Sequence, residues 1–447
     1  MRWATRFTIL SLAVIVDASQ QQFLRVPASV NQSWLSRPWD ERPNGDATGS
    51  LIFQSLAGLM QMKANSKHPR GHAIVRASIP PGTLLYHGRP TTDFPARDWI
   101  AFDPEHSLLF TGGPNGTLFT FTTTRELTLL YFDGCSANMA EGVVDTQDLL
   151  FFGQLKHKPR GWTAELERIQ HGCAWGKQHT SLHRWEVKRA GTWHNNFPGE
   201  VRVHPDPSTL ITFFDPSLTS LVEARRSLTR NEYNAGNASR EDVARVRADV
   251  AEMVARESGA RSGVDWVDLA RVIEDRFADR LPYLQHLLHQ PVVNASAQAA
   301  AVRKQLIVSL VPYMHRGAIG TPEWFVDIAH GCAARFTERL PVSRLTKQEH
   351  LLFHAVEEVL HEICRVYTGA WMDVFDVEAK STEVAARLLE KWSGEFDALT
   401  EWLDWPVWIQ CRPACDVNEY CYVPQGRPWG HLDDHEPRCL LLEDETF

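Results

Sequence analysis

The spacing of apolar positions changes along the chain, from strand-like runs in the first half to helical spacing in the second. Between residues 76 and 216, short runs rich in β-branched and aromatic residues are separated by Gly, Pro, Asn and Asp, which is typical of strands joined by turns. These runs are TLLYHG (83–88), WIAF (99–102), TLFTFTTT (117–124), LTLLYFDG (127–134), SLHRWEVK (181–188), VRVHP (201–205) and LITFF (210–214). One amphipathic helix is expected over 165–178. The pattern predicts an α+β fold whose first domain, 76–216, contains a mainly antiparallel sheet.

A helical region is predicted from residue 217 to residue 405. Two stripes of apolar residues recur every three or four positions: Val243, Val246, Val250 and Met253, and then Leu352, Val356, Val359 and Ile363. Ser239 and Thr346 precede these stripes at positions that suit helix N-caps. We expect four to six helices that pack as a bundle or cover one face of the sheet. The segment 19–75, before the sheet, is interrupted by prolines and carries one helix-like run at 50–64.

The last part of the chain, 406–447, is rich in Trp, Pro and Cys and has little periodicity. It holds four of the eight cysteines, namely Cys411, Cys415, Cys421 and Cys439. They predict either two disulfides, in one of three pairings, or a zinc site completed by Cys439 or His435. An oxidising compartment favours the disulfides.

The first 18 residues predict a secretory signal peptide. Arg2 and Arg6 are followed by the apolar run FTILSLAVIV, and small side chains suit cleavage before Ser19. Four sequons for N-glycosylation are consistent with a secreted chain: Asn31, Asn115, Asn237 and Asn294. We therefore expect a secreted glycoprotein with disulfide bonds.

Composition and charge limit the classes of molecule that we expect this protein to bind. The chain of 447 residues has a net charge of -9, with no basic footprint for nucleic acid. No later segment is long and apolar enough for a transmembrane helix. We expect a small molecule, a glycan or a protein as the partner, and neither nucleic acid nor membrane.

Groups that could take part in chemistry cluster after the first two strand-like runs. Alternation along TLLYHG places His87 on one face at the end of a strand, next to Gly88. LLYHG, followed by WIAF and a helix start containing EHS, resembles the opening of the ADP-ribosyltransferase-like fold in its His-Gly branch. That resemblance implies that His87 and Gly88 hold the nicotinamide half of NAD, with Ser107 near the wall of the site. It also implies that Glu186, in LHRWEVK, polarises the ribose.

A second resemblance covers more of the chain. The blocks LLYFDGCSANMAEGVVDTQDLL, ERIQHGCAWGK and WLDWPVWIQCRPACDVNEYCYVP are similar to those of a large set of secreted fungal proteins. This similarity implies secretion and a fungal source, and it implies no particular reaction.

Two groups of possible metal ligands have simpler interpretations. His350, His354, Glu357 and His361 share one face of a predicted helix, opposite its apolar stripe, which favours a solvated polar face over a zinc site. Asp133, Asp145 and Asp148 are too scattered for a calcium site, and Asp133 before Gly134 favours a turn.

Cys173 precedes Trp175 and has histidines nearby in the sequence. In a secreted chain, a disulfide with a partner such as Cys135 is favoured over a nucleophilic thiolate. Two functions remain open from the sequence. One is a strand-end pocket related to ADP-ribosyl transfer or NAD binding, in which His87 and Glu186 converge. The other is a non-catalytic secreted protein that engages a partner or a glycan through exposed aromatic residues.

Overall fold

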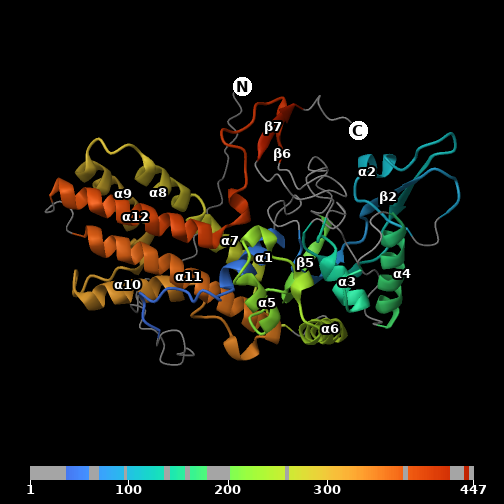
Figure 1. Ribbon diagram of the computed structural model, residues 1–447, viewed down its shortest axis with the longest axis horizontal. Helices are drawn as coiled ribbons and strands as arrows, with labels where there is room; N and C mark the ends of the chain where they lie inside the picture. The colour runs from blue at the N-terminus through green and yellow to red at the C-terminus, as the bar shows by residue number, and fades with distance from the viewer. Residues whose placement is uncertain are drawn as a thin grey trace, which may run out of the picture. The chain divides into compact units, whose positions relative to one another are not determined.

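The computed structural model describes residues 37–59, 70–94, 98–134, 141–156, 162–178, 202–256, 261–375, 381–422 and 437–441. From Trp39 onward the chain forms one compact unit. Figure 1 shows its elements in order along the chain.

The strands form three small antiparallel sheets among the described residues. The largest has the order β4-β1-β5, with β1 (Ala73–Ile79) between β4 (Leu127–Phe132) and β5 (His204–Thr212). A separate hairpin pairs β2 (Leu84–Arg89) with β3 (Thr117–Thr122). In the tail, β6 (Glu419–Tyr422) pairs with β7 (Arg438–Leu441). The antiparallel sheets confirm the expected α+β class.

Helices occupy most of the remaining described chain. Those in the first half are α1 (Gly49–Leu59), α2 (Pro104–Leu108), α3 (Asp145–Phe152) and α4 (Trp162–Gln178). Those of the second half are α5 (Thr219–Arg225), α6 (Arg240–Ala255), α7 (Trp266–Phe277), α8 (Arg280–His289), α9 (Ala295–Leu310), α10 (Pro322–Ala334), α11 (Lys347–Val374) and α12 (Thr382–Leu403). Short 3₁₀ helices connect them, including η5 (Arg230–Glu232) and η6 (Ala235–Asn237). The helical second half is therefore confirmed.

Side-chain caps set several of these helix starts. The Ser239 hydroxyl accepts a hydrogen bond from the backbone N–H of Asp242 at the start of α6. Thr346 and Glu349 form a complete capping box at the start of α11, as the sequence predicted. The two predicted apolar stripes are buried: Val243, Val246, Val250 and Met253 on α6, and Leu352, Val356, Val359 and Ile363 on α11.

The sheet and the helical half share one body. Ile74, Leu130 and Phe132 from β1 and β4 pack with apolar residues of α3 and α6 in a single buried cluster. Helices α1, α7 and α11 contact β5 as well. Helices α8, α9, α11 and α12 pack on one another (Figure 1). Helices α6, α7 and α11 therefore join the helical half to the sheet within one compact unit, while α8, α9, α10 and α12 pack on other helices.

The run WIAF is not a strand, contrary to the expectation. Only Ala101 pairs, in an isolated bridge with Tyr86 that contains two hydrogen bonds of 2.8 Å. The chain then leaves β2 and turns into α2, which begins at Pro104. The run SLHRWEVK lies outside the described residues.

Candidate functional site

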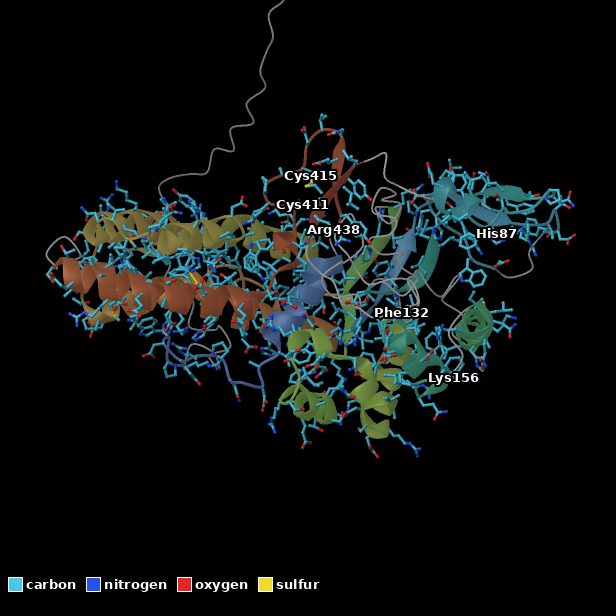
Figure 2. All side chains as sticks on the ribbon, turned by 45° about the horizontal axis from the view of Figure 1, so that its top comes forward. His87, Phe132, Lys156, Cys411, Cys415 and Arg438 are labelled. Carbon is cyan, nitrogen blue, oxygen red and sulfur yellow. A yellow bond between two sulfur atoms is a disulfide. The ribbon has the colours of Figure 1, made fainter. Side chains whose placement is uncertain are left out.

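The β2 and β3 hairpin places the residues that the sequence singled out. His87 lies opposite Phe119 and Leu85 lies opposite Phe121, so these four side chains share one face of the hairpin. Leu85 and His87 are buried, whereas Leu84 on the other face is 43% exposed. The predicted alternation along this strand is confirmed. Figure 2 labels His87 on this hairpin.

His87 is held next to a carboxylate that the sequence analysis did not select. Its Nε2 lies 3.3 Å from Oδ2 of Asp98, with the imidazole almost fully buried. This contact does not meet the geometry of a hydrogen bond, and His87 Nε2 has no hydrogen-bond partner among the described residues. The other oxygen of Asp98 accepts a hydrogen bond from the backbone N–H of Trp99 at 3.0 Å. This bond fixes the carboxylate beside the ring.

Gly88 is explained by packing within the protein. A Cβ at this position would lie 1.7 Å from the carbonyl oxygen of Ser107 on α2. Ser107 is itself 2% exposed. The glycine therefore allows α2 to lie against β2, and this close contact accounts for it without a ligand.

An exposed aromatic group extends the face that contains His87. The ring of Phe94 makes edge contacts with Phe119 and Phe121, with centroids 5.8 Å apart in both pairs. Phe119 also stacks loosely on His87, with a centroid distance of 6.3 Å. Phe94 is 72% exposed, which is unusual for a large apolar side chain. The sequence signal for it was weak, because a single Phe between turns has no periodicity.

Glu186, the other residue implied by the ADP-ribosyltransferase-like resemblance, lies outside the described residues. Its convergence with His87 stays a prediction. Asp98 is thus the carboxylate that the described structure places beside His87.

The face of α11 that carries histidines is not uniformly solvated, contrary to the expectation. His354 is exposed, but Glu357 and His361 are buried. His361 Nε2 lies 2.9 Å from the carbonyl oxygen of Glu41, a residue 320 positions earlier. Burial raises the pKa of Glu357, and this effect outweighs the opposite effect of its contact with His354. No local sequence pattern indicates this contact between α11 and the segment before α1.

The acidic residues near β4 have structural partners. Oδ1 of Asp133 accepts hydrogen bonds of 2.7 Å from the backbone N–H groups of His72 and Ala73. Those donors lie about 60 positions away, so the predicted local turn role for Asp133 is wrong. Burial raises the pKa of Asp133 to about 7. Asp148 accepts a hydrogen bond of 2.8 Å from Arg168.

Asp145 shares the start of α3 with Asp148. Burial, with repulsion from Asp148, raises the pKa of Asp145 to about 7. Neither residue belongs to a group of possible metal ligands in the described part of the chain.

The tail cysteines form disulfides, which confirms the favoured interpretation. Cys411 pairs with Cys421, and Cys415 pairs with Cys439. A third disulfide, Cys332 to Cys364, joins α10 to α11 and was not predicted. Cys173 lies on α4 and has no disulfide among the described residues. Its expected partner Cys135 lies outside them, so that pair stays a prediction.

Comparison with known proteins identifies no relative of this chain. No protein-family model, no curated protein and no solved structure matches the chain. In the part of the chain that the structure describes, no helix has both the length and the apolar character to cross a bilayer.

Proposed function

We propose that this chain is a secreted, N-glycosylated protein that binds a nicotinamide-ribose ligand at the aromatic face of β2 and β3. The chemistry would be related to ADP-ribosyl transfer. One observation carries the proposal: the buried His87, fixed beside Asp98, adjoins a phenylalanine that is 72% exposed.

Each group at this face has a use in binding such a ligand. A flat ring stacked against Phe94 would contribute about 0.5–1.5 kcal/mol beyond the area that it buries. A ring nitrogen of His87 would form a hydrogen bond with an amide or hydroxyl group of the ligand. Asp98 would hold the imidazole in the orientation that this hydrogen bond needs.

The reaction needs a carboxylate at the ribose. In ADP-ribosyl transfer the bond between nicotinamide and the anomeric carbon breaks, and nicotinamide leaves with the electron pair. The acceptor then forms the new bond to that carbon and loses its proton. A carboxylate stabilises the positive charge that develops on the ribose. We assign this role to Glu186.

Three observations support the secreted state. The described sequon residues Asn115, Asn237 and Asn294 are exposed, as an attached glycan requires. Asn294 caps α9 through Oδ1, which accepts from the N–H of Ala297, so its Nδ2 stays available for a glycan. The three disulfides suit an oxidising compartment.

The binding test is calorimetric titration of the secreted protein with NAD. Phe94→Ala should weaken binding by at least about tenfold, or about 1.4 kcal/mol, without lowering the melting temperature. Leu84→Ala is the matched control, because Leu84 is an exposed apolar residue on the opposite face of the same strand. Glu186→Gln should retain binding and lose cleavage of NAD. Absence of heat at millimolar NAD would refute the ligand class.

Secretion has its own test. Expression in a eukaryotic host with the native N-terminus should release a chain that begins at Ser19. Treatment with an N-glycanase should then lower its mass. A chain that stays inside the cell without glycans would contradict this part of the proposal.

A second candidate function is non-catalytic binding of a protein or a glycan at the same unit. It is favoured by exposed apolar side chains around the hairpin: Phe94, Ile100, Leu108 and Leu109. An oligosaccharide array probed with the protein and with Phe94→Ala tests the glycan form of this candidate. Binding that is unchanged by the substitution would reject the hairpin as the surface.

A further inference from the structure

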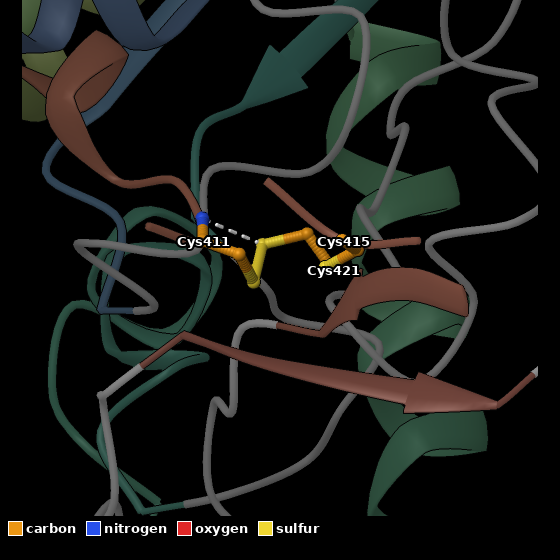
Figure 3. A group of neighbouring side chains, drawn as sticks. All are labelled: Cys411, Cys415 and Cys421. Carbon is orange, nitrogen blue, oxygen red and sulfur yellow. Dashed lines mark hydrogen bonds between the residues drawn. A yellow bond between two sulfur atoms is a disulfide. The ribbon is translucent and has the colours of Figure 1, made fainter. Parts of the chain in front are cut away.

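The tail brings four cysteine sulfurs and one carboxylate into two groups that share Cys415. The sulfur atoms of Cys411, Cys415 and Cys421 lie within 4.8 Å of one another. The ligand atoms of Cys415, Glu419 and Cys439 form a second such group, so Cys415 belongs to both. Figure 3 shows the first group at close range.

Strand pairing accounts for the convergence. Cys421 on β6 lies directly opposite Cys439 on β7. Their disulfide partners, Cys411 and Cys415, both come from the short segment before β6. The Cα atoms of the two pairs are 5.6 Å and 5.5 Å apart. The two strands and the short segment before β6 thus carry all four sulfurs.

We propose that these four sulfurs form one redox-exchangeable site, which holds two disulfides when oxidised and one Zn²⁺ ion as four thiolates when reduced. In tetrahedral zinc with Zn–S bonds of about 2.3 Å, neighbouring sulfurs are separated by about 3.8 Å. The sulfurs of Cys411, Cys415 and Cys421 already lie within 4.8 Å of one another, whereas Cys439 joins them only through Cys415. Reduction, which frees Cys439 from Cys415, would have to bring its sulfur toward the other three.

The surroundings suit a charged thiolate centre. The backbone N–H of Cys411 lies 2.9 Å from Sγ of Cys421, a contact drawn in Figure 3. Donors of this kind orient and tune the sulfur ligands of a metal. Four thiolates with Zn²⁺ carry a net charge of about −2. The exposed Arg412 and Arg438, each adjacent to a cysteine, offset it.

The exchange balances with an external reductant. Each disulfide takes up two electrons and two protons to give two thiols, while a phosphine reductant is oxidised to its oxide with oxygen from water. Binding of Zn²⁺ then releases the four thiol protons. Soft thiolate ligands favour Zn²⁺ over Mg²⁺ or Ca²⁺. Three of the four cysteines are partly exposed, so both reagents can reach the site.

Glu419 is not assigned as a ligand. Its carboxylate accepts a hydrogen bond of 3.0 Å from the backbone N–H of Asp416, which shapes the turn before β6. Its replacement by Gln therefore separates a four-cysteine site from a mixed one.

The experiment uses the full chain carrying Cys135→Ser and Cys173→Ser, so that thiols outside the tail do not contribute. The protein is reduced anaerobically with a phosphine and titrated with Co²⁺ and then Zn²⁺. The buried Cys332 to Cys364 disulfide should survive this treatment. We expect one equivalent of Co²⁺ with the absorption of tetrahedral thiolate coordination, displaced by Zn²⁺. The oxidised protein should bind none.

Variants identify the ligands. Cys439→Ser and, separately, Cys421→Ser should each weaken metal binding by at least about tenfold. Glu419→Gln should leave it unchanged. Circular dichroism verifies that the helical body of each variant stays folded. Uptake below one equivalent, octahedral cobalt spectra, or binding that survives both cysteine substitutions would overturn the proposal.

Discussion

The imidazole of His72 stacks on the ring of Phe214, with centroids 4.3 Å apart and planes 17° from parallel. Both side chains are buried, His72 just before β1 and Phe214 just after β5. The guanidinium of Arg225 lies over the ring of Phe214, 5.7 Å from the ring centroid. His72 Nε2 makes no hydrogen bond of normal geometry among the described residues, although the carbonyls of Arg70 and Tyr233 favour its protonation. The ring therefore sits neutral in an apolar and cationic environment.

This stack predicts a loss of stability in mild acid. Burial, with repulsion from Arg225 and Arg70, lowers the pKa of His72 to about 3. Between that value and the ordinary pKa near 6.5, the unfolded chain binds a proton that the folded chain does not. The free energy of unfolding should therefore fall as pH drops from 6.5 toward 3. His72→Phe, which cannot take up a proton, should reduce this loss by roughly 2–3 kcal/mol at pH 4.

The difference between wild type and His72→Phe is the quantity to measure, by urea unfolding at several pH values. Asp133 acts in the opposite direction, since its pKa is raised to about 7 and its protonation favours the folded state below that pH. Comparing the two proteins cancels this contribution. Stability curves that run parallel from pH 7 to pH 4 would show that His72 does not titrate as expected.

Gly88→Ala should destabilise the hairpin. The new methyl would meet the Ser107 carbonyl at 1.7 Å, so β2 or α2 must shift, at a cost of about 1–3 kcal/mol. Gly112→Ala is the matched control, because a Cβ there has open space. Thermal unfolding of the two variants decides the matter. If Gly88→Ala were as stable as wild type yet failed to bind NAD, the glycine would serve the ligand instead.

Removal of the Cys332 to Cys364 disulfide should lower the stability of the helical half. The bond links α10 and α11 across 32 positions, and its loss as Cys332→Ala with Cys364→Ala should cost about 2–4 kcal/mol. Removal of Cys411 to Cys421, which spans 10 positions in the tail, should cost less. Urea unfolding followed by tryptophan fluorescence tests both. Equal effects would contradict the dependence on loop length.

Arg230 should be a larger contributor to stability than its neighbour Arg226. Its guanidinium donates hydrogen bonds to the carbonyls of Glu401 and Trp402 at the end of α12, at 3.1 Å and 2.6 Å. It also donates to Ser50 Oγ, at 3.1 Å, near the start of α1. Arg230→Met should cost about 1.5–3 kcal/mol, because it leaves the partly buried Trp402 carbonyl without this donor.

Arg226→Met is the control for this prediction. Arg226 pairs with Asp46 at the surface, and its side chain is 61% exposed. Its replacement should leave the unfolding midpoint almost unchanged. Similar midpoints for the two variants would indicate that the Arg230 contacts add nothing.

Features encoded by neighbouring residues were predictable from the sequence. The apolar stripe of α6 and its Ser239 cap lie within one or two helical turns of each other, so the local pattern contains all that is needed. The same holds for the alternation along β2, which correctly placed His87 and Leu85 on one face; the structure shows that this face is buried. Cysteine density and the expected compartment were enough to predict disulfides in the tail.

Only the tertiary structure decided which distant groups meet. The sequence left three pairings for the tail cysteines, and the structure shows one of them, Cys411 with Cys421 and Cys415 with Cys439. The pattern predicted a solvated His361, whose ring nitrogen instead contacts the Glu41 carbonyl. It also left Gly88 open to a ligand, whereas α2 packs against this glycine. Such contacts depend on how segments far apart in the chain pack together. Periodicity describes one element at a time, so it reports the face that a residue occupies and not the neighbour that the face will meet.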